Sequence, residues 1–228
     1  MKNLILLHGA LATAEQLQEL ASLLQENFKV YIYEFEGHGK NSDSTNPFQI
    51  ENMAEALESF CRLNDLDNTY IFGYSMGGYV ALYHNICYPQ RTQKIVCLAT
   101  KFDWNPESAQ KEANILTAQN ILDNFPGFAN LLQQRHGAHW ESVLEKTANM
   151  MTSLGDKPIL DKNNLIKISA TCLLLLGDKD HMVSKEETML AAEAIPNCNF
   201  ITLENTIHPM EKVDSKKLLT ILIQFLQS

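Results

Sequence analysis

The sequence Gly73-Tyr74-Ser75-Met76-Gly77-Gly78 lies between a short β-prone run, residues 70–72, and a segment with apolar residues at helical spacing, 79–88. This order predicts a strand, a sharp turn and a helix, with Ser75 at the apex of the turn. Glycine two residues before and two after the serine lets the chain fold back without a side-chain clash. Such a turn exposes the serine hydroxyl beside the first amide of the helix, which suits a nucleophile for acyl transfer. Because a short glycine-serine pattern also arises by chance, the interpretation depends on the rest of the chain.

The segments around this turn alternate between strand and helix patterns, as βαβ units require. We expect strands at residues 3–7, 30–35, 70–72, 94–99, 170–176 and 199–203, and helices at 14–24, 50–63, 79–88, 185–194 and 215–226. Thr13 is expected to cap the first of these helices together with Gln16. Continuous apolar strands are typical of a parallel sheet buried on both faces. The sequence therefore predicts an α/β fold with a mostly parallel central sheet flanked by helices.

Residues 101–168 interrupt the alternation with helical patterns alone. Asn105-Pro106 is a strong helix start, and the helix that begins at Trp140 is expected to end at Gly155. An all-helical insertion between parallel strands is most simply a lid over the strand carboxyl ends, where open α/β sheets bind ligands. We therefore expect one domain over residues 1–228, with a core of 1–100 and 169–228 and a small helical lid at about 101–168.

The composition restricts the classes of partner. The formal net charge is −9 and lysine and arginine do not cluster, which argues against a nucleic-acid partner. No apolar run approaches the length of a membrane span, and the N-terminal run is shorter than a secretory signal requires. Five cysteines without a C-x-x-C pattern are expected to be small core residues in a reducing compartment. These features predict a cytoplasmic protein that acts on a small-molecule substrate, with no membrane partner.

Two further residues are placed to act with Ser75. His208 lies in the loop after the last expected strand, and Asp180 follows the preceding strand by a few residues. Both could approach Ser75, because the carboxyl ends of parallel strands meet at one edge of the sheet. Asp178 is the alternative acid, and both aspartates could instead form a turn after Gly177. The chain order of serine, aspartate and histidine is that of an α/β-hydrolase triad.

Taken together, these motifs resemble the α/β-hydrolase superfamily over nearly the whole chain. The matching pieces are His8-Gly9-Ala10, Glu36-Gly37-His38-Gly39-Lys40-Asn41-Ser42, Gly73-Tyr74-Ser75-Met76-Gly77-Gly78, Leu176-Gly177-Asp178-Lys179-Asp180 and Ile207-His208-Pro209. The resemblance implies that Ser75 is the nucleophile, that Asp180 orients His208, and that His208 acts as general base and then acid. It also implies an oxyanion hole made by the amides of Ala10 and Met76, with Leu11 as the neighbouring alternative.

The sequence departs from the family pattern in two places. Glu36 precedes Gly37 where members usually carry an aspartate and a nearby arginine, and the chain starts at what would be the third strand of the full fold. Neither departure removes the implied catalytic residues. Serine rather than aspartate at position 75 argues against dehalogenase and epoxide hydrolase chemistry, which use a carboxylate nucleophile.

The expected reaction is hydrolysis of a small carboxylic ester or thioester through an acyl-enzyme. Leu11, Trp104 and Met150 are candidate substrate-binding residues. For Trp104 and Met150, which lie in or beside the lid, helical spacing fits a packed lid core about as well. His136 and His139 lack a surrounding zinc-binding pattern, so we expect neither a metal nor an organic cofactor. Lid-bearing relatives also include C–C bond hydrolases and a menaquinone-pathway lyase, which is the alternative function. A non-catalytic ligand-binding protein is the third hypothesis.

Overall fold

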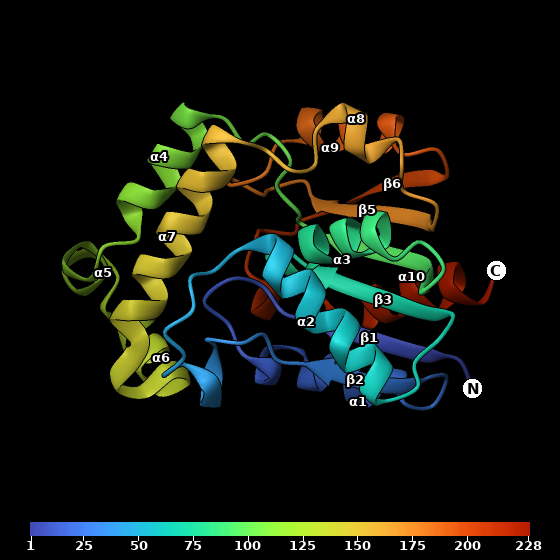
Figure 1. Ribbon diagram of the computed structural model, residues 1–228, viewed down its shortest axis with the longest axis horizontal. Helices are drawn as coiled ribbons and strands as arrows, with labels where there is room; N and C mark the ends of the chain where they lie inside the picture. Colours follow the sequence, from blue (N-terminus) through green and yellow to red (C-terminus); the bar gives the residue numbers. More distant parts are fainter.

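The computed structural model describes residues 1–228 and contains a central sheet of six strands with helices on both faces (Figure 1). The strands are β1 (Asn3–Leu7), β2 (Lys29–Tyr33), β3 (Thr69–Tyr74), β4 (Thr92–Leu98), β5 (Thr171–Gly177) and β6 (Cys198–Leu203). They lie in the order β2-β1-β3-β4-β5-β6, and every neighbouring pair is parallel. The predicted α/β fold with a parallel central sheet is therefore confirmed.

Helices bury the two faces of this sheet in separate layers. One layer contains α1 (Gln18–Leu24) and α10 (Ser215–Gln227), and the other contains α2 (Ile50–Leu63), α3 (Met76–Cys87) and α9 (Lys185–Ala194). Successive residues of β1 alternate between the layers, with Leu4 and Leu6 in the first and Ile5 and Leu7 in the second. Burial on both faces explains why the strands appear in the sequence as continuous apolar runs.

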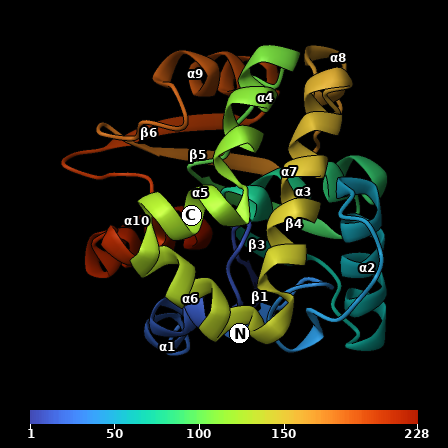
Figure 2. The same ribbon diagram turned by 90° about the vertical axis from the view of Figure 1, so that its left-hand side faces the viewer.

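A helical insertion lies between β4 and β5, at one end of the sheet (Figure 2). Its helices at that end are α4 (Pro106–Ile115), α5 (Ala118–Asn124), α6 (Pro126–His136) and α7 (Trp140–Asp156), whereas the short α8 (Lys162–Leu165) lies beside α9 (Figure 1). Asn105 caps α4 as predicted, in a reciprocal capping box with Ser108. The sequence did not predict α5 and α8, because helices of seven and four residues are too short to display a helical period.

The first helix starts differently from the prediction. Ala14–Leu17 forms a 3-10 helix that leads into α1, and the Thr13 side chain makes no capping hydrogen bond. The expected partner, Gln16, instead accepts a hydrogen bond from the Gly9 amide at 3.2 Å. The predicted cap was therefore wrong because Gln16 supports the loop after β1.

Gly155 lies inside α7 rather than ending it, which corrects the prediction. A Cβ atom at this position would approach both the Ala109 Cβ and the Asn105 carbonyl oxygen to within 3.0 Å. Glycine is therefore required by the close packing of α7 against α4 and the residue that caps it.

Gly155→Ala should destabilise the protein by about 1–2 kcal/mol. Overpacking a tight contact costs about 1–3 kcal/mol, and the helix propensity gained by alanine returns at most about 1 kcal/mol. Gly127→Ala in α6 is the matched control, since a Cβ there would meet nothing within 4 Å. Urea unfolding measures both effects; equal stability of the two variants would contradict the packing argument.

No helix in the structure combines the length and apolar character needed to cross a membrane. All five cysteines are free thiols. Cys61, Cys97 and Cys172 are buried and Cys198 is partly so, but Cys87 is exposed near the end of α3. The expectation that every cysteine is a core residue is therefore wrong for Cys87.

Candidate active site

The loops after β1 and β3 meet where the strand order reverses. From β1 the chain moves to β2 at the edge of the sheet, and β3 then returns to the other side of β1, with Leu7 beside Gly73. Ligands of open α/β sheets bind in the crevice at such a switch point. This topology brings Ala10, from the loop after β1, to the same cavities as Ser75.

Ser75 occupies a sharp turn between β3 and α3, with φ 51° and ψ −115°. Positive φ is uncommon for residues other than glycine and persists where the surroundings enforce it. The Ser75 amide donates to the Leu98 carbonyl at 2.8 Å, and its carbonyl accepts from the Thr100 hydroxyl at 3.1 Å. These bonds to the end of β4 and the loop beyond it hold both sides of the turn.

The two glycines that flank the serine are required by close backbone contacts. A Cβ at Gly73 would lie within 3.0 Å of the Gly78 nitrogen, and one at Gly77 would collide with the Leu7 carbonyl oxygen. The chain can therefore reverse direction tightly against β1 only with glycine at these positions. This is the steric requirement that the sequence pattern predicts.

His208 and Asp180 are joined by a hydrogen bond of 2.7 Å between the histidine Nδ1 and the aspartate Oδ2. The other oxygen of Asp180 accepts amide hydrogen bonds from Met182 and Val183, both at 2.9 Å. Burial alone would raise the pKa of Asp180, but the hydrogen bond and charge of His208 and the two amides lower it below its ordinary value. An ionised Asp180 holds the histidine proton on Nδ1, which leaves Nε2 able to accept a proton.

Asp178, the alternative acid, has a different role in the structure. Its Oδ1 accepts the Thr206 amide at 3.1 Å, and the Lys179 amide donates to the Thr206 carbonyl at 3.0 Å. A Cβ at Gly177 would collide with the same carbonyl. The loops after β5 and β6 are thus held together by the Asp178 side chain and by backbone contacts close to His208 in the chain, while the His208 ring bonds to Asp180.

Two cavities meet at Ser75. The larger, of about 460 Å³, is also lined by Ala10, Leu11 and His208, and the smaller, of about 30 Å³, by Ala10, Met76, Trp104 and Met150. No direct hydrogen bond joins the Ser75 hydroxyl to His208, although both line the larger cavity. Catalytic hydrogen bonds are often long without substrate and tighten when it binds.

Ala10 and Met76 both present backbone amides near the serine. The Ala10 amide makes no hydrogen bond within the protein. Met76 is the first residue of α3, so its amide has no partner inside the helix. Leu11, the neighbouring alternative, has φ 60° and lines only the larger of the two cavities. Both amides are therefore free of partners within the protein, and their role as an oxyanion hole stays a prediction from the sequence.

His8 supports the loop that carries Ala10. Its fully buried ring accepts the Phe35 amide at Nε2, at 3.2 Å, so the proton lies on Nδ1 and is donated to the Gly9 carbonyl at 2.8 Å. Burial lowers the pKa of His8 to about 4, which keeps the ring neutral near pH 7.

Residues at the end of α6 hold the same loop from the helical insertion. His136 accepts the Gly39 amide at Nδ1, at 3.1 Å, so its Nε2 donates to the Leu11 carbonyl at 3.2 Å. Arg135 donates to the same carbonyl at 3.4 Å and to the Glu211 carboxylate at 2.7 Å. No sequence motif predicted this contact, since the bonded atoms of Leu11 and Gly39 are backbone groups distant in the chain.

His136→Ala should lower kcat for an ester substrate by about tenfold with little change in KM. Removing an oxyanion donor outright lowers kcat by about 10²- to 10³-fold. Loosening the loop that carries the Ala10 amide should cost part of that. His139→Ala is the control, because His139 is exposed three residues away. His136→Gln should restore part of the rate, since its amide can donate to the Leu11 carbonyl. Equal rates for His136→Ala and His139→Ala would contradict this role.

Both ring nitrogens of His136 are engaged by backbone groups, and no group of three or more histidine, cysteine, aspartate or glutamate side chains is arranged to hold a metal ion.

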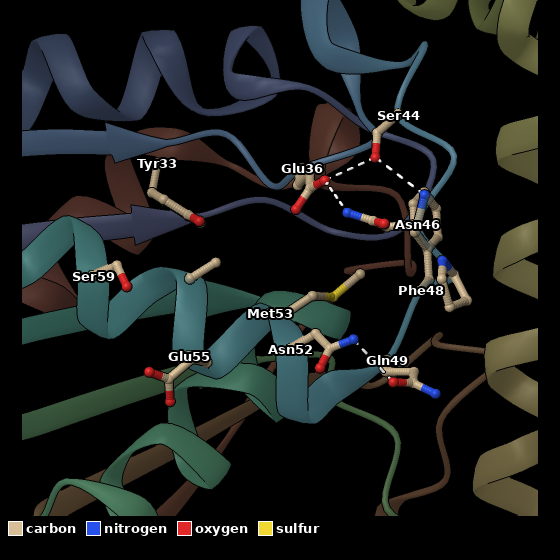
Figure 3. Close-up of a pocket in the computed structure, with 12 residues that line it drawn as sticks. Tyr33, Glu36, Ser44, Asn46, Phe48, Gln49, Asn52, Met53, Glu55 and Ser59 are labelled. Carbon is tan, nitrogen blue, oxygen red and sulfur yellow. Dashed lines mark hydrogen bonds between the residues drawn. The ribbon is translucent and has the colours of Figure 1, made fainter.

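A separate pocket of about 290 Å³ lies between α2 and the loop after β2 (Figure 3). Glu36 accepts hydrogen bonds there from the Ser44 hydroxyl at 2.8 Å and from the side-chain NH₂ group of Asn46 at 2.7 Å. Ser75 and His208 do not line it. Glu36, which departs from the family pattern, therefore organises its own loop at a distance from the serine.

Comparisons with known proteins agree with this architecture. Residues 2–163 match a family model described as alpha/beta hydrolase fold. Over 226 residues the chain is 22% identical to pimeloyl-[acyl-carrier protein] methyl ester esterase of Xanthomonas campestris pv. campestris (strain B100), with 90% of this chain and 87% of the relative covered.

Two solved structures extend the comparison. An enol-lactonase from Burkholderia xenovorans LB400 has a TM-score of 0.83 at 14% identity, covering 100% of this chain and 92% of that one. A thermophilic esterase from Thermogutta terrifontis has a TM-score of 0.79 at 22% identity, covering 100% of this chain and 90% of that one. At these identities the structural likeness concerns the fold.

Proposed function

Because the chain belongs to the α/β-hydrolase family and is a hydrolase, we propose that it cleaves a small carboxylic ester or thioester through an acyl-enzyme on Ser75. The observation that carries the proposal is the 2.7 Å hydrogen bond between His208 and Asp180 at the cavity that Ser75 also lines. A serine is a weak nucleophile unless a base accepts its proton and a third group orients that base. The esterase named above supports this class of reaction for the family.

Acylation begins with proton transfer from the Ser75 hydroxyl to Nε2 of His208. The serine oxygen attacks the carbonyl carbon of the substrate, and the amides of Ala10 and Met76 stabilise the negative charge on the carbonyl oxygen. The tetrahedral intermediate collapses when protonated His208 donates its proton to the leaving oxygen or sulfur. Asp180 stabilises the imidazolium that exists between the two transfers.

Deacylation repeats the steps of acylation with water in place of the serine hydroxyl. His208 takes a proton from the water, the hydroxide adds to the acyl carbon, and the proton is returned to Ser75 as the acid leaves. The acyl-enzyme divides one difficult displacement into two easier steps.

The positions of the arginines favour a substrate of low negative charge. Arginine occurs only at Arg62, Arg91 and Arg135. Arg62 and Arg91 bind Glu58, whereas Arg135 lines the larger cavity and is paired with Glu211. This arrangement offers no unpaired arginine fork for a polyanion, which supports an ester over the polyanionic substrate of the lyase alternative.

Hydrolysis of p-nitrophenyl acetate and of an acetyl thioester tests the proposal. We expect both substrates to be turned over near neutral pH, with the acid and the alcohol or thiol released in equal amounts. Absence of turnover on both substrates would contradict the proposal and favour C–C bond cleavage on the same residues.

A further inference from the structure

The two cavities at Ser75 differ in which catalytic groups they contain. His208 lines the 460 Å³ cavity and is absent from the lining of the 30 Å³ cavity. Ala10 lines both, and Met76 lines only the smaller one. A carbonyl carbon bound at Ser75, with its oxygen towards the two amides, therefore has one substituent in each cavity.

The position of His208 determines which cavity holds the leaving group and which holds the acyl chain. The protonated imidazole must reach the leaving atom of the tetrahedral intermediate within hydrogen-bond distance. The leaving group therefore occupies the cavity that His208 lines, and the acyl chain extends into the other. We propose that the enzyme acts on esters or thioesters of short acyl groups, about two to four carbons, whose alcohol or thiol is mainly apolar and longer than the acyl chain. This inference rests on the proposed function and specifies its substrate class.

The smaller cavity limits the acyl chain. A volume of about 30 Å³ holds on the order of two water-sized groups beyond the carbonyl carbon. Buried Trp104, Met150 and Leu154 close it from the helical insertion and the loop that leads into it. Tyr79 closes it from α3, and its hydroxyl is fixed by the Leu160 amide at 2.9 Å. These walls are packed, so a longer chain would have to displace core side chains.

The larger cavity has room and a suitable surface for the leaving group. Its apolar wall comes from α4, α6 and the residue after α4 and consists of Ile115, Leu116, Phe128 and Leu131. Its polar edge carries Glu112, Arg135, Glu211 and Lys212, charges of both signs. This surface suits an extended apolar group with a polar end. In a methyl ester esterase the leaving group is methanol, so the short substituent is the alcohol. Here the short substituent is the acyl chain.

Two isomeric esters test the assignment directly on the unaltered enzyme. Octyl acetate and methyl nonanoate have the same composition, but they place the long chain on opposite sides of the carbonyl. We expect kcat/KM to be at least tenfold higher for octyl acetate, since each well-buried methylene contributes about fourfold to binding. A preference for methyl nonanoate, equal rates, or turnover of neither isomer would overturn the inference.

Variants of the two cavities provide a second test. Met150→Ala should shift the optimum of a p-nitrophenyl ester series, acetate to decanoate, by two or more carbons without changing the preference among acetates of different alcohols. Phe128→Ala is the matched variant, because Phe128 lines only the larger cavity. It should weaken the preference for long alcohols and leave the acyl optimum unchanged. The opposite pattern would overturn the assignment.

Turnover of p-nitrophenyl acetate, measured beside the two isomers, separates the cavity assignment from ester hydrolysis itself. Turnover of p-nitrophenyl acetate together with a preference for methyl nonanoate would overturn the cavity assignment alone. Absence of any ester turnover would overturn the proposed function and this inference with it.

Discussion

Ser75→Ala is expected to lower kcat for p-nitrophenyl acetate by four or more orders of magnitude. The substitution removes the atom that forms the acyl-enzyme, and removal of a triad nucleophile elsewhere costs on the order of 10⁶ in kcat. The residual rate should come from the Ala10 and Met76 amides and from substrate binding. Steady-state hydrolysis at saturating substrate measures the loss.

The fold should tolerate this substitution, which makes the kinetic result interpretable. The bonds that hold the turn use the backbone of Ser75, and no hydrogen bond in the structure depends on its hydroxyl. Thermal unfolding of the variant should therefore resemble that of the wild type. Ser153→Ala, at an exposed position in α7, controls for removing a hydroxyl. A Ser75→Ala protein that retained a tenth of the wild-type rate would contradict the assignment of the nucleophile.

Asp180→Asn should lower kcat by about four orders of magnitude with a small effect on folding, as for the equivalent change in a serine protease triad. The asparagine oxygen can still accept the amides of Met182 and Val183, which bond to a single oxygen of Asp180. Its NH₂ group would then face Nδ1 of His208. That nitrogen would have to accept a hydrogen bond, so the imidazole proton would move to Nε2 and His208 could no longer act as a base.

Asp178→Asn is the matched control for this prediction. Asp178 is exposed and bonds to the Thr206 amide, which an asparagine oxygen can also accept. We expect kcat within a few-fold of the wild type. A large loss in Asp178→Asn, or a loss below tenfold in Asp180→Asn, would contradict the assignment of the acid.

Several elements of the site could be predicted because they depend on local steric rules. Gly73 and Gly77 are necessary for a turn that packs against β1, so the turn is visible in the sequence. The loop positions of Asp180 and His208 follow from parallel strands that end at one edge of the sheet. The choice between Asp178 and Asp180 needed coordinates, since both follow the same strand.

Other elements depend on contacts between distant segments and had no local pattern. His136 and Arg135 bond to the Leu11 carbonyl, a backbone atom that any residue would provide. Gly155 fits the pattern of a helix end as well as that of a close helix contact, and the packing of α7 against α4 determined which applied. The cavity sizes likewise follow from side-chain packing in the helical insertion, which periodicity alone does not specify.

Intact-mass analysis after treatment with a fluorophosphonate ester tests whether Ser75 is an activated nucleophile, because this reagent forms a stable covalent bond with an activated serine. We expect one adduct per wild-type chain, located by peptide mapping at Ser75 and absent from Ser75→Ala. Asp180→Asn should react far more slowly, since His208 activates the serine in the same way for the reagent and for an ester. An unmodified wild-type chain, or an adduct that persists in Ser75→Ala, would contradict the assignment of Ser75 as the nucleophile.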